Sequence, residues 1–241
     1  MSYNCVCFLR GFGRGLLRTL RGENWIRSKR KRAFDFCLLA IIWVPAACIA
    51  LFSALAIWTI YGGPILFRQK RIGRDGKIFT IHKFRTTPVG SQELTCLGEL
   101  LNVLGADETP QILYDIGRGV MGVIGARPLI PQDFPKMRAI LGRHRYRKWY
   151  RAYTACRPGW MSAFSQPSRT YIAQSPAYLM ARYRYEVWYF KHASPRVDLA
   201  IFFRSLTMWC TDMPRLVRAI YSFCKFVIIN RHAGRAYDGQ L

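Results

Sequence analysis

One pair of adjacent acidic residues stands out in this chain, because acidic residues are scarce in it. Only 13 of the 241 residues are aspartate or glutamate, against 37 lysines and arginines, and Asp107 and Glu108 are the one adjacent acidic pair. A carboxylate in so basic a setting stays ionised near neutral pH, and it can attack a phosphorus centre or share Mg²⁺ with a diphosphate. The structural alternative is that Asp107 caps a helix beginning at Pro110, with Glu108 near its positive end.

Cations suited to phosphate occur on both sides of this pair. Arginine holds phosphate oxygens through two parallel N–H bonds, whereas lysine acts as a compact charge. The Arg-Pro dipeptides in "GARP" and "CRPG" would each present a guanidinium beside a rigid turn. Taken alone, each cation has the simpler interpretation of a solvated or structural residue. The candidate phosphate ligands are Lys83, Arg85, Arg127, Arg157 and Arg169.

A long apolar segment precedes these residues. Residues 37–60 carry no charge, and as one helix they would reach about 36 Å, enough to cross a hydrocarbon core of about 30 Å. Basic clusters flank both ends, and such clusters stay in the cytoplasm. Pro45 would break the helix and let the chain return to the side from which it came. We therefore expect a re-entrant helix-break-helix over residues 33–62, with a kinked single-pass helix as the alternative.

The remaining elements predict an α/β fold dominated by helices around a small sheet. Two strands, within 65–67 and 78–84, are expected to flank a turn near residues 73–76. Helical patterns follow near 94–104, 109–116, 134–153, 177–193 and, broken near Pro214, 198–229. The expected organisation is a basic arm (1–32, a surface helix or a disordered segment), the membrane hairpin (33–62), a catalytic domain (63–197) and an amphipathic membrane-surface extension (198–241).

Composition limits the classes of partner. The net charge of +24 and a pI near 10.3 indicate an anionic partner, which means nucleic acid, acidic lipid head groups or phosphorylated small molecules. The eight scattered cysteines form no C-x-x-C pair, which favours a reduced, cytosol-facing chain. The segment "GRGVMG" has the G-x-G-x-x-G spacing, but "VIGARP" after it cannot open the helix that a dinucleotide site needs.

Several motifs, taken in order, resemble the bacterial sugar transferase family, the monotopic phosphoglycosyl transferases. The resemblance covers about residues 31–206. It implies transfer of a sugar 1-phosphate from a nucleoside diphosphate sugar, expected to be a UDP-sugar, to polyprenyl phosphate, which primes glycan or exopolysaccharide synthesis. The motifs are "KRAFD", an apolar run with a central proline, "GGPILFRQKRIGRDGKIFTIHKFRT", "DETPQ", "VIGARPLIP", "RPG" and "ASPRVDLAIFFRSL".

The resemblance also implies roles for single residues. Asp107 would be the nucleophile that forms an aspartyl phosphosugar and releases a nucleoside monophosphate. Glu108 would hold Mg²⁺ together with Asp107 or position the acceptor, while the candidate phosphate ligands neutralise charge. The implied location is the cytoplasmic face of the bacterial inner membrane, against anionic lipids. Homo-oligomerisation through the C-terminal extension is a further expectation.

Three positions depart from the family pattern. Asn102 stands where the family usually has an arginine, Thr109 interrupts "DELPQL", and Val120 stands where an acid is usual. These departures leave open an inactive or specialised homologue that binds lipid phosphate or a partner. The third hypothesis is a membrane-tethered nucleic-acid-binding protein that uses the basic, aromatic stretch 143–153. No recognised nucleic-acid motif accompanies that stretch, so nucleic acid is not expected as a partner.

Overall fold

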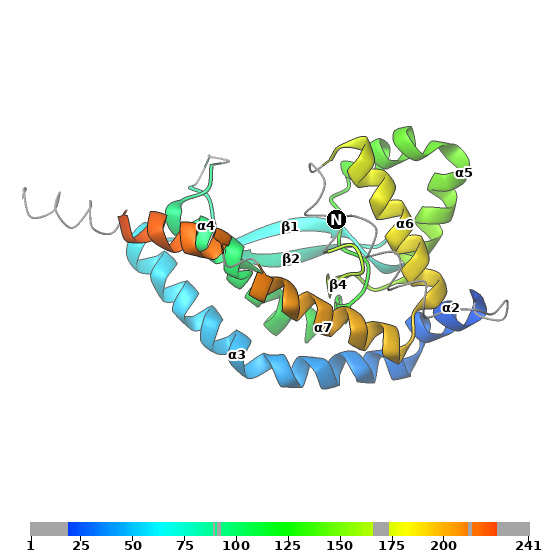
Figure 1. Ribbon diagram of the computed structural model, residues 1–241, viewed down its shortest axis with the longest axis horizontal. Helices are drawn as coiled ribbons and strands as arrows, with labels where there is room; N and C mark the ends of the chain where they lie inside the picture. Colours follow the sequence, from blue (N-terminus) through cyan, green and yellow to red (C-terminus); the bar gives the residue numbers. More distant parts are fainter. Residues whose placement is uncertain (1–18, 89, 91–92, 166–173, 212–213, 226–241) are drawn as a thin grey trace, which may run out of the picture.

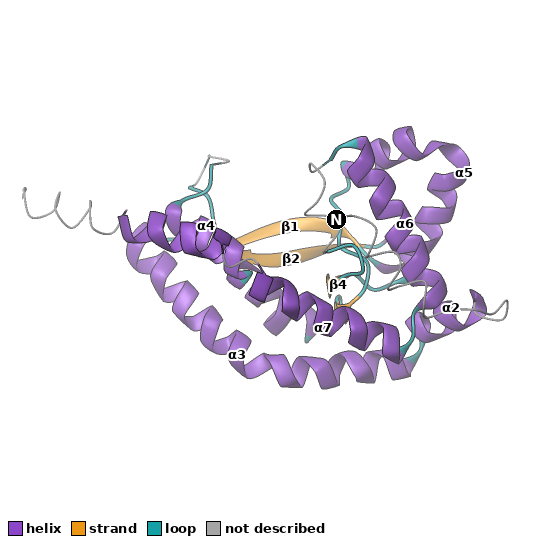
Figure 2. Ribbon diagram, in the orientation of Figure 1, coloured by secondary structure: helices purple, strands orange, loops and turns teal. Residues whose placement is uncertain are grey.

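Helices dominate the fold (Figure 2), and the strands form two small two-stranded sheets. The computed structural model describes residues 19–88, 90, 93–165, 174–211 and 214–225. The helix-dominated α/β class predicted from the sequence is confirmed. The helices are α2 (Thr19–Arg27), α3 (Lys29–Tyr61), α4 (Cys96–Leu104), α5 (Asp133–Ala155), α6 (Pro176–His192), α7 (Pro195–Thr211), the short turns η2 (Arg74–Gly76) and η3 (Ala106–Glu108), and the π-helical η4 (Gln111–Ile116).

The long apolar segment forms one continuous helix, α3. It begins at the N-cap Ser28, whose hydroxyl accepts a bond from the Lys31 N–H, and it ends at Gly62. The predicted break at Pro45 is wrong, because the helix runs through this residue. A proline removes only its own N–H bond, so the turns on either side can continue when the helix bends. The helix curves along one edge of the molecule, with most of the other elements on one side of it (Figure 1).

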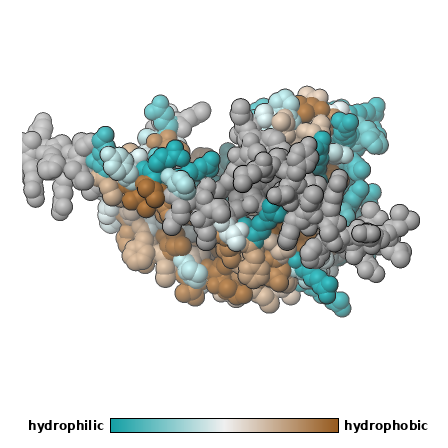
Figure 3. All heavy atoms as spheres, in the orientation of Figure 1, coloured by the Kyte–Doolittle hydropathy of each residue, from teal (hydrophilic) through white to brown (hydrophobic). Residues whose placement is uncertain are grey.

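Only one face of α3 packs against the rest of the protein. Its other faces expose large apolar side chains, including Ile41 at 68% and Phe52 at 71% exposure. Figure 3 shows these apolar side chains gathered along the lower edge that α3 forms. Among the described residues α3 alone is long and apolar enough to cross a membrane. The buried positions of α3 are Lys31, Asp35, Leu38, Leu39, Ala46, Ser53 and Ile57.

The first sheet is the predicted hairpin. β1 (Leu66–Ile72) pairs antiparallel with β2 (Ile78–Phe84). The turn between them needs left-handed backbone, which Asp75 and Gly76 supply with φ values of +57° and +73°. Both predicted strands and their turn are confirmed, and the first strand extends beyond its predicted end.

The second sheet joins the two Arg-Pro loops. β3 (Gly122–Ile124) and β4 (Gly159–Met161) pair in parallel. The backbones approach so closely that a Cβ on Gly125 would lie 2.2 Å from the Arg157 carbonyl oxygen. Glycine is therefore required where the two loops cross. "GRGVMG" leads into β3 rather than into a helix, so its exclusion as a dinucleotide site is confirmed.

Both ends of the described part of the chain contribute to the packed domain. The expected basic arm lies outside the described residues up to residue 18, and its last part forms α2, which packs against α6 and buries Ile26. In α7, Asp198, Ile201 and Phe202 are buried, so the expected extension contributes to the core as far as this helix. A further helix covers residues 214–225. Residues 226–241 lie outside the described part.

Candidate functional site

The acidic pair lies in η3, directly after α4. Helix α4 ends at Gly105, which has a left-handed φ of +67° and turns the chain. The next residue, Ala106, is buried in a cluster with Ile57 of α3 and Phe84 of β2. This packing holds the acidic pair between the C-terminal half of α3 and the end of β2.

Lys83 bridges the two carboxylates. Its Nζ lies 2.7 Å from Glu108 Oε1 and 3.3 Å from Asp107 Oδ2. Arg127 approaches from the first Arg-Pro loop, with Nη2 3.8 Å from Glu108 Oε1, and the Trp160 side chain also hydrogen-bonds to Glu108. The structure thus brings together four of the predicted site residues. The helix-capping interpretation of Asp107 is wrong, because neither η3 nor η4 has a side-chain cap bond.

The surroundings of the two carboxyl groups give them different pKa values. Burial raises the pKa of Asp107 above its ordinary value, although Lys83 opposes this rise. Burial alone would also raise the pKa of Glu108, but Lys83 and Arg127 outweigh it and hold that pKa at about 2. The closer contact of Lys83 with Glu108 agrees with this order. Adjacent acids with separated pKa values can take different chemical roles.

Arg127 is positioned by a buried network from two other helices. The fully buried guanidinium of Arg182 in α6 donates to the Arg127 carbonyl oxygen and forms a 2.9 Å ion pair with Glu186. Trp149 of α5 donates to Glu186 at 2.6 Å. These residues were not predicted from the sequence. Their signal was weak, because an arginine and a glutamate four positions apart usually form a surface pair.

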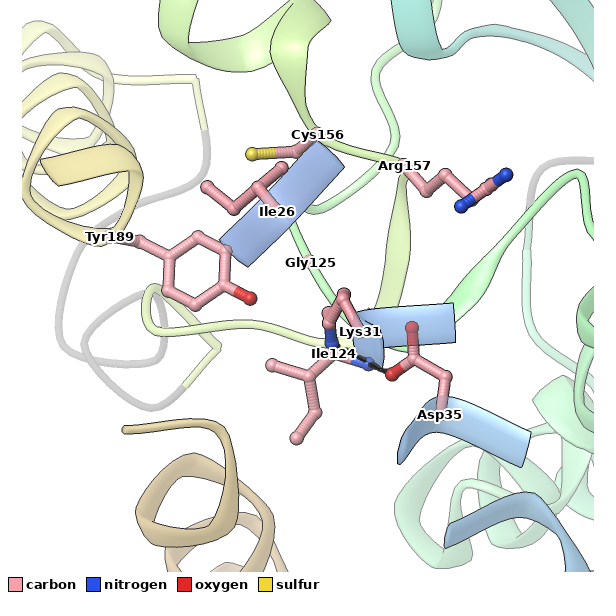
Figure 4. Close-up of a pocket in the computed structure, with 8 residues that line it drawn as sticks. All are labelled: Ile26, Lys31, Asp35, Ile124, Gly125, Cys156, Arg157 and Tyr189. Carbon is pink, nitrogen blue, oxygen red and sulfur yellow. Dashed lines mark hydrogen bonds and ion pairs between the residues drawn. The ribbon is translucent and has the colours of Figure 1, made fainter. Parts of the chain in front are cut away.

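The other predicted phosphate ligands are not brought to the acidic pair by any described contact. Arg85 donates to the carbonyl oxygens of Tyr61 and Gly63, each at 3.3 Å, and so caps the C-terminal end of α3. Figure 4 shows Arg157 on the rim of a small cavity, its guanidinium directed away from the Lys31–Asp35 pair. Arg169 lies outside the described residues.

Two polar features near the site were also missed. Asp115 of η4 accepts bonds from the His82 backbone N–H at 2.9 Å and pairs with the His82 ring at 2.8 Å, which fastens η4 to β2 one residue before Lys83. Gln111 follows the acidic pair by three residues, and its buried side-chain amide nitrogen has no partner among the described residues. Such a donor is available to a bound anion.

The donor set fits a Mg²⁺ site that a substrate would complete. The described residues contain no group of three or more potential metal ligands. Mg²⁺ is commonly held by one or two carboxylates plus substrate phosphates rather than by a cage of protein ligands. Asp107 and Glu108 supply two carboxylates, and the Lys83 ammonium between them shows that the pair accommodates a cation.

The match to a family model assigns this fold and site to a protein family. The family model described as bacterial sugar transferase matches residues 26–212, and the chain belongs to this family. Relatives carry more specific names. This chain is 24% identical over 208 residues to undecaprenyl-phosphate galactose phosphotransferase of Salmonella typhimurium, and the match covers 74% of this chain and 40% of the relative.

Two further relatives differ in the sugar that their names specify. The chain is 36% identical over 111 residues to UDP-glucose:undecaprenyl-phosphate glucose-1-phosphate transferase of Caulobacter vibrioides, covering 41% of each protein. It is 27% identical over 193 residues to UDP-N-acetylgalactosamine-undecaprenyl-phosphate N-acetylgalactosaminephosphotransferase of Aeromonas hydrophila, covering 73% of this chain and 42% of the relative. The chain thus spans about two fifths of the length of these relatives.

Proposed function

We propose that this protein transfers a sugar 1-phosphate from a UDP-sugar to polyprenyl phosphate and so primes the synthesis of a glycan. The observation that carries the proposal is the buried Asp107–Glu108 pair bridged by Lys83, next to an exposed apolar helix. The names of the relatives, which specify a sugar phosphotransferase and undecaprenyl phosphate, support the same chemistry.

Asp107 is the better nucleophile of the pair. Its raised pKa makes it the more basic carboxylate, and its contact with Lys83 is the longer one. In the proposed first step a carboxylate oxygen of Asp107 attacks the phosphorus that carries the sugar. The bond from that phosphorus to the bridging oxygen breaks, and UMP leaves. Lys83 and Arg127 lie where they would neutralise the charge of the leaving diphosphate oxygens.

The second step returns Asp107 to its free form. An oxygen of polyprenyl phosphate attacks the same phosphorus, the aspartyl–phosphorus bond breaks, and the lipid diphosphosugar is released. Dividing the transfer suits substrates of different solubility, because the sugar nucleotide departs as UMP before the lipid attacks. Asp107 and Glu108 would hold Mg²⁺ with the donor diphosphate, and the metal would supply charge neutralisation at those phosphate oxygens.

The packing of α3 supports a membrane helix whose two ends lie on the same side. Its buried face contacts β3 and η4 and, near its C-terminal end, η3. If α3 crossed a bilayer straight, these polar elements would have to lie in the hydrocarbon, where unpaired backbone is costly. We therefore infer a helix that is embedded from one leaflet, on the cytoplasmic face of the inner membrane, and that holds the acidic pair near the lipid phosphate.

The proposal is tested by the intact mass of the purified protein after incubation with single UDP-sugars. We expect a covalent phosphosugar adduct and release of UMP with at least one sugar. Asp107→Asn should abolish both, because an amide is a poor nucleophile toward phosphorus. Adding polyprenyl phosphate to the wild-type adduct should remove it and yield the lipid diphosphosugar.

Asp133→Asn is the matched control, because Asp133 is also a buried aspartate but lies in the first turn of α5. This variant should keep the adduct. An adduct that persists in Asp107→Asn would overturn the assignment of the nucleophile. No adduct and no UMP release with any sugar would favour the specialised homologue that binds lipid phosphate without turnover.

A further inference from the structure

The helix at residues 214–225 lies beyond the part of the chain that the family model matches, which ends at residue 212. Its residues divide into three stripes at helical spacing. One, called the buried stripe, faces the protein and has a buried alanine between two half-buried residues; one is exposed and apolar, and one is exposed and basic. The stripes are, in that order, Leu216, Ala219 and Phe223; Val217, Ile220, Tyr221 and Cys224; and Arg215, Arg218 and Lys225.

The buried stripe fastens this helix to the site end of α3. Ala219 is fully buried. Phe223 packs against the cluster that contains Ile57 of α3 and Ala106, the residue before the acidic pair. In Figure 1 the helix lies at the left end of the molecule, close to the C-terminal end of α3. Helix 214–225 therefore contacts the same apolar cluster that positions η3.

The apolar stripe includes large side chains that are exposed. Val217 is 62% exposed and Tyr221 is 69% exposed. They belong to the same end of the molecule as the exposed Leu55 and Trp58 of α3. Figure 3 shows apolar side chains at this end as well as along α3. A lone exposed apolar residue is ordinary, but several exposed apolar residues on one side of a helix indicate an interaction site.

We propose that helix 214–225 is an accessory membrane contact that seats the site end of α3 on an anionic bilayer. On a helical projection the basic stripe borders the apolar stripe, with Arg218 and Lys225 next to Tyr221 and Arg215 on the far side. The apolar side chains can therefore enter the acyl region while the basic side chains extend to head-group level. The charge pattern favours a bilayer over a second copy of this chain, because a chain of net charge +24 repels itself. The proposal rests on the membrane contact of α3 proposed above, but not on the transfer reaction.

Site-specific photocrosslinking of the full chain tests this contact. Benzoylphenylalanine is placed singly at positions 217, 221 and 215 and, as a positive control, at position 52 on the exposed face of α3. The protein is reconstituted in vesicles of phosphatidylethanolamine and phosphatidylglycerol, irradiated and weighed intact. We expect lipid adducts at 52, 217 and 221 and a much lower yield at 215, which is exposed on the side of the same helix turned away from the apolar stripe.

The role of charge is tested with Arg215→Gln combined with Arg218→Gln. The adduct yield at 217 should fall relative to that at 52, and vesicles of phosphatidylcholine alone should lower it in the same way. Equal yields at 217 and 215, or none at 217 while 52 reacts, would overturn the proposal. Crosslinked dimers at 217 and 221 in place of lipid adducts would overturn it in favour of a second copy. The adduct at 52 and the phosphosugar mass report separately on membrane insertion and on transfer.

Discussion

At the scale of single residues, Lys83 controls the acidity of the proposed site. It contacts both carboxylates, and Glu108 owes its pKa of about 2 mainly to Lys83 and then to Arg127, both acting against burial. Without this ammonium, burial and mutual repulsion would raise the pKa of both acids. A protonated Asp107 cannot attack phosphorus, so Lys83 should determine the pH range of activity as well as its rate.

We expect Lys83→Met to lower kcat/KM by about 10²-fold, the typical loss when one charge-stabilising donor is removed. The acidic limb of the pH–rate profile should move to higher pH. The depressed pKa of Glu108 also contributes stability above its ordinary pKa of 4.5, which is lost as the pH falls toward about 2. The variant should lose part of that contribution. The measurements are pH-dependent UMP release and thermal unfolding in detergent.

Lys77→Met is the control, because Lys77 is exposed and precedes the same strand. It should leave both the rate and the acidic limb in place. An unchanged acidic limb in Lys83→Met would mean that the lysine does not set the acidity of the pair.

At the scale of elements, the N-terminal end of α3 is joined to α7 by a buried ion network. The Lys31 ammonium lies 2.8 Å from Asp35 Oδ1 and 2.9 Å from Asp198 Oδ2. Asp198 also accepts bonds from Trp25 at 2.8 Å and Tyr189 at 2.7 Å. Two of the family-like motifs, "KRAFD" and "ASPRVDLAIFFRSL", thus meet in a structural role away from the acidic pair.

Asp198→Asn should destabilise the protein by about 3–5 kcal/mol, the cost of removing one partner from a buried ion pair. The readout is the midpoint of thermal unfolding in detergent, compared at equal detergent concentration. Asp75→Asn serves as the comparison, because Asp75 is exposed and its ion pairs with Arg27 and Arg74 are both 3.7 Å long. Exposed pairs of this kind contribute little, so that variant should unfold near the wild-type temperature. Equal midpoints for the two variants would contradict the structural role of the network.

At the scale of the whole molecule, the domain packs along one face of α3. The buried positions of α3 run from Lys31 to Ile57, so the domain contacts this helix along most of the helix length. The basic flanks are only partly available to lipid, since Lys31 is buried and Arg32 donates to the Met121 and Ile116 carbonyl oxygens. This arrangement is the basis of the proposed topology, with both helix ends on one side of a membrane.

Cysteines introduced at Arg30 and Lys77, both exposed, should react with a membrane-impermeant maleimide only after cells are opened. The unsubstituted chain sets the background from native thiols. Both positions should behave alike, because the proposed topology places both on the cytoplasmic side. Labelling of one position in intact cells and the other only after lysis would contradict the one-sided topology and restore the single-pass alternative.

Local patterns in the sequence were sufficient for the β1–β2 hairpin and for most of the helices, and they drew attention to the adjacent Asp107 and Glu108. Hairpin turns and helix stripes depend on residues close in sequence, which is why their approximate bounds could be predicted. The aromatic residues in 143–153 show the limit. The stretch seemed suited to stacking on bases, but Trp149 and Tyr153 are buried in the core, because the helix turns them toward α6 and β1.

The sequence by itself determined that the chain has a charged acidic pair in a basic setting, a long apolar helix and cations around the pair. Only the tertiary structure decided which cations meet the carboxylates. Lys83 and Arg127 do, whereas Arg85 caps α3 and Arg157 lies by another cavity. It also decided that α3 continues through Pro45 without a break. These outcomes depend on contacts between segments far apart in the chain, and such contacts are selected by packing and by the pairing of buried charges, which a local pattern does not encode.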